Sequence, residues 1–150
     1  MQGTAEPQKT NKYYFDDMKL QCLSPILWTK DLKATVSFYE DVLGFKSQSN
    51  FPNFVSLSKD SVTIMFVVPE DEPYDCKDLN NKADFFAKPT LTGSIFITMK
   101  QVDTLWESVK NKATIKDPLA DREYLMRDFS ILDNNGYELV FGQDISKNSP

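Results

Sequence analysis

Histidine is absent from this 150-residue sequence. Its absence removes the side chain that most often serves as a general base near neutral pH and as a ligand for transition metals. It also removes the middle member of a Ser-His-Asp triad. Any acid or base chemistry in this protein must therefore use carboxylates, hydroxyls, lysines or thiols.

Cysteine is nearly absent as well. Cys22 and Cys76 can form one disulfide at most, and their spacing matches neither a CxxC redox motif nor a zinc site. We interpret both as free thiols in a reducing compartment. The N-terminal segment lacks the uninterrupted apolar core of a signal peptide, so we expect a cytoplasmic protein.

Long apolar runs and excess positive charge are also missing. No run approaches the roughly 18 residues that a membrane span needs. The chain has 22 acidic and 17 basic residues, a net charge of −5, which repels nucleic-acid phosphates and anionic lipids. We therefore expect neither nucleic acid nor membrane as a partner, and a small neutral or cationic organic molecule is the better fit.

The most informative feature that is present is an internal repeat. In the first half, a strand-like run at 23–29 leads into a helical pattern that begins at Asp31 and ends near Gly44. Two extended runs, 54–57 and 62–67, follow and have the pattern of a hairpin.

The second half repeats this order. A strand-like run at 94–99 precedes a helical stripe that contains Trp106, which we expect in the core. A shift of about 70 residues superposes the strands and helices, and a shift of about 75 sets Phe54–Phe66 against Phe129–Phe141. The sequence thus predicts an α+β fold of two βαβββ repeats, with mixed sheets and one helix on the outer face of each.

The predicted organisation is one domain over 21–143. It comprises a first repeat at about 22–68, a linker at 69–92 and a second repeat at about 93–143, flanked by an N-terminal extension at 1–20 and a C-terminal tail at 144–150. Phe85-Phe86 in the linker either cap an apolar edge of their own chain or form a subunit contact.

Two strings carry a resemblance to a known family. DLKATVSFYEDVLGF (31–45) and MRDFSILDNNGYELVFGQ (126–143) resemble the vicinal-oxygen-chelate superfamily, which includes glyoxalase I, extradiol dioxygenases and bleomycin-resistance proteins. The resemblance covers about residues 22 to 143. It implies that the two repeats curl around a cup-shaped cleft, which is built either within one chain or across a dimer. We expect the protein to be a homodimer.

The resemblance also implies where a metal would bind in the enzymes of the superfamily, with one ligand on the first and one on the last strand of each repeat. Those positions fall on Ser24, Met65, Ser94 and Val140. Such side chains hold a divalent ion poorly, so we expect no metal and no cofactor. Bleomycin-resistance proteins also lack these metal ligands. The resemblance to them implies a protein that sequesters its ligand without altering it.

Strand alternation from these positions predicts the cup face. The candidate ligand-binding residues are Ser24, Ile26, Trp28, Met65, Ser94, Phe96, Thr98, Arg127, Glu138 and Val140. The opposite parity is aliphatic and aromatic, as expected for a face that packs on a helix. A surface that mixes large apolar side chains, hydroxyls and one acid fits an aromatic or cationic organic ligand.

Several of these residues have a second interpretation. Trp28 is either a stacking platform or a plug in the floor of the cup. Arg127 either reaches an anionic group in the cleft or pairs with one of the many acids. Glu138 attracts a cationic ligand, acts as a catalytic base with a raised pKa, or is an edge-strand charge that faces water.

Three functions remain open on the sequence. The first is a glyoxalase-like binding protein of the bleomycin-resistance type, for which an antibiotic-resistance role follows only by analogy. The second is a metal-independent lyase or isomerase that uses Glu138 or Tyr124 as acid or base. The third is a protein-interaction module that docks through the free sheet face or Phe85-Phe86. A titratable group with a pKa near neutrality would favour the enzyme.

Overall fold

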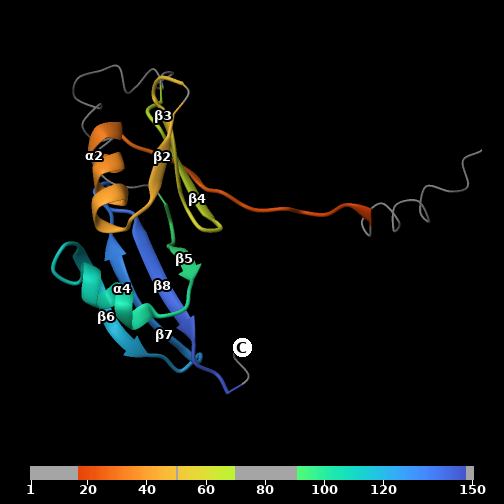
Figure 1. The fold of residues 1–150 in the computed structure, drawn as a ribbon, viewed down its shortest axis with the longest axis vertical. Helices are drawn as coiled ribbons and strands as arrows, with labels where there is room; N and C mark the ends of the chain where they lie inside the picture. Colours follow the sequence, from red (N-terminus) through yellow and green to blue (C-terminus); the bar gives the residue numbers. More distant parts are fainter. Residues whose placement is uncertain (1–16, 50, 70–90, 148–150) are drawn as a thin grey trace, which may run out of the picture.

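The computed structural model describes residues 17–49, 51–69 and 91–147. Two modules with the same order of elements, a strand, a helix and three more strands, lie next to each other (Figure 1). Cys76 and Phe85-Phe86 lie outside the described residues, and Cys22 is an exposed free thiol. None of the helices in the described ranges is long and apolar enough to cross a membrane.

The first module forms a four-stranded mixed sheet in the order β1-β4-β3-β2, in which β1 runs parallel to β4. Its elements are β1 (Ile26–Trp28), α2 (Leu32–Ser37), a π-helical continuation η1 (Phe38–Val42), β2 (Lys46–Gln48), β3 (Phe54–Lys59) and β4 (Val62–Val67). The helix begins and ends as predicted: the Asp31 carboxylate accepts the N–H of Ala34 at 3.0 Å, and Gly44 has φ +73°.

The second module repeats this topology in the order β5-β8-β7-β6. Its elements are β5 (Ile95–Thr98), α4 (Val102–Val109), β6 (Thr114–Asp121), β7 (Met126–Leu132) and β8 (Glu138–Asp144). β5 is parallel to β8, and the other neighbours are antiparallel. The predicted α+β fold with a βαβββ duplication is confirmed.

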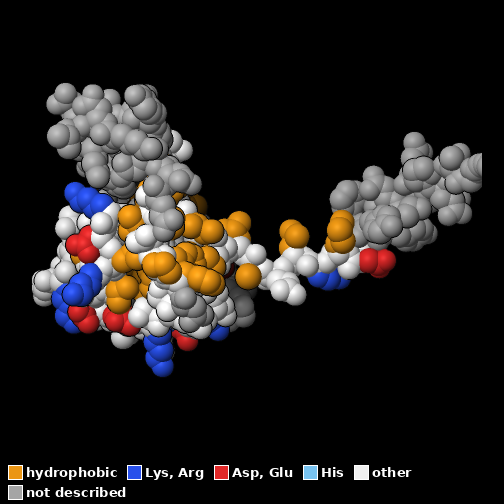
Figure 2. Space-filling view, turned by 90° about the horizontal axis from the view of Figure 1, so that it is seen from above, with side chains coloured by type: hydrophobic (Ala, Val, Ile, Leu, Met, Phe, Trp, Pro, Cys, Tyr) orange, Lys and Arg blue, Asp and Glu red, His pale blue; other side chains and the backbone are white. Residues whose placement is uncertain are grey.

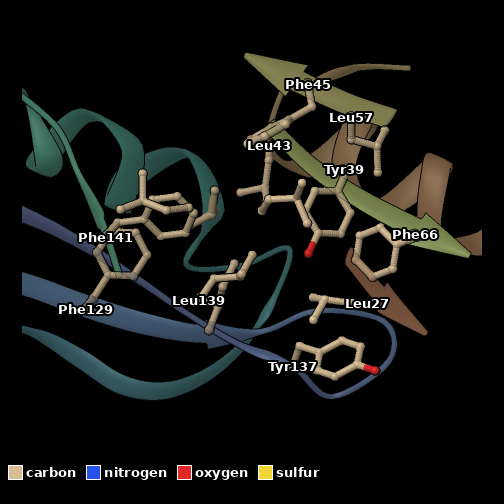
Figure 3. Packing of buried hydrophobic residues seen from close by; sticks show 14 of the residues in the cluster. Leu27, Tyr39, Leu43, Phe45, Leu57, Phe66, Phe129, Tyr137, Leu139 and Phe141 are labelled. Atoms are coloured by element: carbon tan, nitrogen blue, oxygen red, sulfur yellow. The ribbon is translucent and has the colours of Figure 1, made fainter. Parts of the chain in front are cut away.

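The core lies between the helices and one face of each sheet (Figure 3). The residues predicted to face the helices are buried there, including Leu27, Phe66, Leu139 and Phe141. Trp106 also packs as expected, with its ring centroid 5.2 Å from that of Phe129. The opposite face of each sheet therefore remains available for function.

The two hairpins differ by one residue in their turns. Lys59 pairs with Val62 around a two-residue turn, whereas Asp133 donates its N–H to the Tyr137 carbonyl across a three-residue turn. For this reason the predicted superposition of Phe129 on Phe54 is wrong by one residue. The buried Phe129 of the second repeat corresponds to the buried Val55 of the first. A one-residue offset moves every side chain of β7 to the other face of the sheet.

Candidate functional site

A hollow of about 420 Å³ lies on the free face of the second sheet. We call it the second-sheet hollow. Alternating residues of β5, β7 and β8 reach it, together with side chains from β6 and the loop that follows β6. Its lining residues are Ser94, Phe96, Asp117, Arg122, Tyr124, Asp128, Ser130, Glu138 and Val140.

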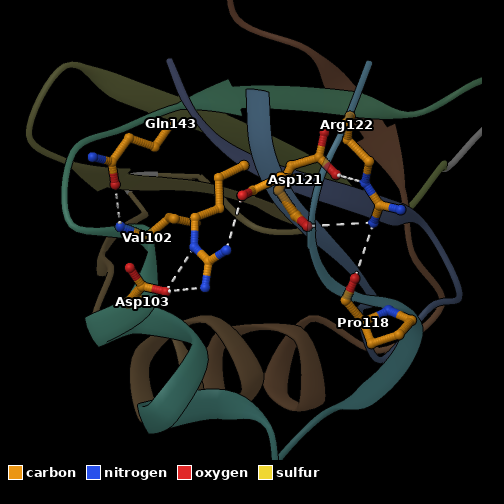
Figure 4. Close-up of polar contacts among 8 residues, drawn as sticks. Val102, Asp103, Pro118, Asp121, Arg122 and Gln143 are labelled. Atoms are coloured by element: carbon orange, nitrogen blue, oxygen red, sulfur yellow. Dashed lines mark hydrogen bonds and ion pairs between the residues drawn. The ribbon is translucent and has the colours of Figure 1, made fainter. Parts of the chain in front are cut away.

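A buried carboxylate organises one wall of this hollow. Asp128 is only 3% exposed, and its two oxygens accept hydrogen bonds from Arg122 Nε at 2.8 Å and from the Tyr124 hydroxyl at 2.6 Å. Arg122 also donates to the Pro118 carbonyl at 2.9 Å (Figure 4). The hydrogen bond to Asp128 raises the pKa of Arg122, so Arg122 stays charged. This wall of the hollow is therefore held by an ion pair.

Glu138 is held by a second ion pair. Lys116 Nζ on β6 lies 2.9 Å from Glu138 Oε1. The hydrogen bond from Lys116, helped by one from Ser130, lowers the pKa of Glu138 in spite of partial burial. Glu138 is therefore an ionised carboxylate, not a base with a pKa raised toward neutrality.

Phe96 forms the apolar side of the hollow together with Val140. The Phe96 ring lies directly over Gly142, since a Cβ at that position would fall 2.6 Å from Phe96 Cζ. Glycine on β8 thus allows the ring to lie against the sheet. The ring remains 46% exposed, and Tyr124, 62% exposed, offers a second aromatic surface to the hollow.

The structure brings together four of the predicted ligand-binding residues: Ser94, Phe96, Glu138 and Val140. The others lie elsewhere. Ile26 and Trp28 of β1 line a separate hollow of about 220 Å³ with Leu91 and with Tyr137 of the second module. Met65 pairs with Ile26 across the first sheet, Ser24 is half-buried just before β1, and Thr98 ends β5 beside the contact between modules.

Arg127 lies on the helix side of β7, away from the hollow. It forms ion pairs of 2.8 Å with Asp103 of α4 and with Asp121 of β6 (Figure 4). Arg127 thus makes the ion pairs with acids that were its alternative interpretation, and it does not line the second-sheet hollow. The cause is the longer second turn, which shifts the register of β7 by one residue.

Sequence reasoning missed Asp117, Arg122, Asp128 and Ser130, and named Tyr124 only as a possible acid or base. Asp128 and Ser130 alternate with Phe129 and Ile131, so the correct register would have identified them. Strand alternation does not predict the position of Asp117, because β6 is irregular, with register shifts between Ile115 and Ala120.

The residues at the metal positions of the superfamily do not fit a divalent ion. Ser24 and Ser94 offer neutral hydroxyls, Met65 a thioether and Val140 no donor atom, whereas such ions prefer carboxylate, imidazole or thiolate ligands. Glu138, the nearest carboxylate to Val140, is already paired with Lys116. In the described ranges, no group of three or more His, Cys, Asp or Glu could hold a metal ion.

Comparison with known families gives a match over most of the chain. The family described as "Glyoxalase/Bleomycin resistance protein/Dioxygenase superfamily" matches residues 21–141. A comparison with curated protein sequences gave no significant match.

Solved structures share the fold. A glyoxalase/bleomycin resistance protein/dioxygenase from Alicyclobacillus acidocaldarius superposes with a TM-score of 0.63 at 17% identity, covering 86% of this chain and 96% of its own. A protein from Nocardioides with the same description gives 0.59 at 17% identity, covering 95% and 97%. A virulence protein from Salmonella typhimurium gives 0.61 at 16% identity, covering 85% and 100%. At these identities the likeness shows the fold alone.

Proposed function

The chain belongs to the glyoxalase/bleomycin resistance protein/dioxygenase superfamily, and on this premise we propose that it binds a small cationic aromatic molecule in the second-sheet hollow without the help of a metal. The observation that carries the proposal is the composition of the hollow. Aromatic surface from Phe96 and Tyr124 adjoins a cluster of carboxylates in a volume typical of small-molecule sites.

The charge of the hollow favours a cation. Three carboxylates, Asp117, Asp128 and Glu138, line it against one guanidinium, that of Arg122. Asp128 and Glu138 are already held by Arg122 and Lys116. Among the residues that the structure describes, Asp117 accepts just one long hydrogen bond, from Ser130 at 3.4 Å. Asp117 is therefore the carboxylate best able to pair with a cationic group of the ligand.

The aromatic surfaces favour a flat ligand body. The rings of Phe96 and Tyr124 stay exposed, and the Tyr124 hydroxyl is fixed by its hydrogen bond to Asp128. A ring held in this way loses little conformational entropy when a ligand stacks on it. Stacking and cation–π contact would add to the charge attraction.

The metal-independent lyase or isomerase receives less support. A general base works best with a pKa near the working pH, whereas the pKa of Glu138 is lowered by Lys116. The hydrogen bond to Asp128 raises the pKa of Tyr124, which keeps its proton in place. Neither group is tuned for proton transfer near neutrality, and binding without reaction fits them better.

The proposal is tested by isothermal titration calorimetry with cationic aromatic compounds, bleomycin and acridine orange among them. We expect saturable binding that EDTA treatment leaves unchanged. Asp117→Asn should weaken binding by about tenfold or more, because a hydrogen bond to a charged group contributes at least about 1.5 kcal/mol. Phe96→Ala should weaken it by a similar factor through the loss of stacking surface.

Asp41→Asn is the matched control, since it removes an exposed acid of η1 outside the hollow. This variant should bind as the wild type does. If no compound of the panel binds, or if Asp117→Asn and Phe96→Ala bind as tightly as Asp41→Asn, the proposed site is refuted.

We further propose that a second copy of the chain covers the free face of the first sheet. Ile26 and Trp28 are 60% and 44% exposed there. A view from above shows hydrophobic side chains gathered over the middle of the molecule (Figure 2). Two-fold homodimers are the commonest assemblies of soluble proteins. Sedimentation velocity should show a dimer, and Ile26→Asp should shift it to monomer. A wild-type monomer at high micromolar concentration would contradict this proposal.

A further inference from the structure

The two modules meet at two junctions that repeat each other. At each, the turn of the last hairpin of one module approaches the strand and helix start of the other. At the first junction this turn is Asp133–Tyr137, and it is tied down by hydrogen bonds. Tyr39 donates to Asp133 at 2.7 Å, Tyr137 donates to the Trp28 carbonyl at 2.8 Å, and Thr29 and Asn135 are joined at 2.7 Å.

The second junction lacks these side chains. Counted from the first residue of each helix, the equivalent of Tyr39 is Val109. Met65 pairs with β1 and Val140 pairs with β5 at the equivalent place, so Met65 and Val140 correspond to each other. Tyr137 lies three residues before Val140. Its equivalent, three residues before Met65, is therefore Val62. The turn is also one residue shorter. Within the described chain, no side-chain hydrogen bond joins the turn 59–62 to residues 97–105.

At this junction, Val62 in the place of Tyr137 and the shorter turn leave a hollow of about 360 Å³, which Val62 lines and which we call the junction pocket. Its apolar lining comes from both modules and includes Leu43, Phe45, Ile97, Leu105 and Phe141. Figure 3 shows Leu43 and Phe45 on the first module and Phe141 on the second. Ile97 and Phe141 belong to the helix side of their strands, so this pocket is separate from the second-sheet hollow.

Two lysines give the junction pocket its charge. Lys59 reaches it from the end of β3 and Lys100 from the loop after β5, against one carboxylate, Asp60. Lys59 folds over the end of the first helix, since its Nζ lies 4.0 Å from where a Cβ on Gly44 would be. Neither lysine forms an ion pair with a described residue.

We propose that the junction pocket binds an amphiphilic organic anion, a carboxylate with an aliphatic or aromatic body. The body fills the apolar space beside Val62, where the other junction has a tyrosine, and the carboxylate pairs with Lys59 and Lys100. Because the two lysines come from different modules, the bound anion bridges them, as the Tyr39–Asp133 hydrogen bond does at the first junction. The site therefore stabilises the contact between modules when it is filled.

Calorimetric titration with decanoate tests the proposal. The wild type should bind one decanoate per chain. The double variant Lys59→Gln/Lys100→Gln should bind at least about tenfold more weakly, since a hydrogen bond to a charged group is worth about that factor or more. Val62→Tyr, which places at this junction the side chain found at the other, should abolish binding by filling the space.

Three controls separate this site from the rest of the surface. Lys33→Gln removes an exposed lysine of α2, Trp28→Ala removes apolar surface on the first sheet, and Asp117→Asn changes the second-sheet hollow. All three should bind decanoate as the wild type does. The proposal is overturned if the wild type does not bind, if the double lysine variant binds normally, or if Trp28→Ala loses binding. The lysine variants keep this test decisive even if Val62→Tyr does not fold.

Discussion

Replacing Asp133 with alanine is expected to lower the free energy of unfolding by about 3 kcal/mol or more. The Asp133 carboxylate is buried and accepts three hydrogen bonds: from the Tyr39 hydroxyl at 2.7 Å and from the N–H groups of Asn135 and Tyr137 at 2.8 and 2.9 Å. Alanine leaves these three donors without their acceptor in a largely dry site, at a cost of about 1–3 kcal/mol each.

Urea denaturation followed by circular dichroism measures this loss. Asp41→Ala serves as the control, since Asp41 is exposed and its replacement should change the free energy of unfolding by no more than about 0.5 kcal/mol. Equal stability of the two variants would show that Asp133 does not hold the modules together.

Asp133→Asn adds a pH arm to the same experiment. Burial raises the pKa of Asp133, although the hydrogen bonds it accepts act in the opposite direction. The folded protein therefore binds a proton at this carboxyl more readily than the unfolded chain does. The stability that protonation of Asp133 adds is fully present below the unfolded pKa of about 3.9 and is lost as the pH rises through the raised folded pKa, whereas the hydrogen bonds that the carboxylate accepts remain. Relative to Asp133→Asn, the wild type should be most stable near about pH 3 and lose this advantage by neutral pH.

Arg122→Met is the second change with a large expected effect, a loss of about 2–3 kcal/mol. The Asp128 side chain is 4% exposed, and Arg122 is its cationic partner at 2.8 Å. Removing the cation leaves a buried charge, which is costly. The Arg122 side chain is itself 28% exposed, so water offsets part of that cost.

The double variant Arg122→Met/Asp128→Asn isolates this pair. Neutralising Asp128 removes the unpaired charge, so the double variant should be more stable than Arg122→Met alone, as urea denaturation would measure. Losses that simply add would mean that the ion pair does not stabilise the wall of the second-sheet hollow.

Much of the fold could be predicted from the sequence because local chemistry and burial agree there. Asp31 caps a helix, Gly44 ends it with a positive φ, and Leu27 and Ile64 alternate with residues of the free face. These features depend only on near neighbours in the chain. Because the pattern occurs twice, it also predicts that both modules share one strand topology.

The site was less predictable because it depends on register. One extra residue in the Asp133–Tyr137 turn decides that Asp128 and Ser130, not Arg127 and Phe129, face the free side of β7. Pairing across strands, such as Lys116 with Glu138, depends on an irregular strand. The position of Trp28 in a separate hollow depends on how the modules pack, which the pattern of a single repeat does not specify.

Mapping a bound cationic ligand by two-dimensional ¹H–¹⁵N NMR tests the central claim most directly. Acridine orange added to the labelled protein should shift the amide signals of Asp117, Ser130 and Glu138 in a saturable way. The signals of Asp60 and Lys100 at the junction pocket should stay in place. Shifts confined to the junction pocket or to the first sheet, with those of β6 to β8 unchanged, would contradict the assignment of the ligand site to the second-sheet hollow.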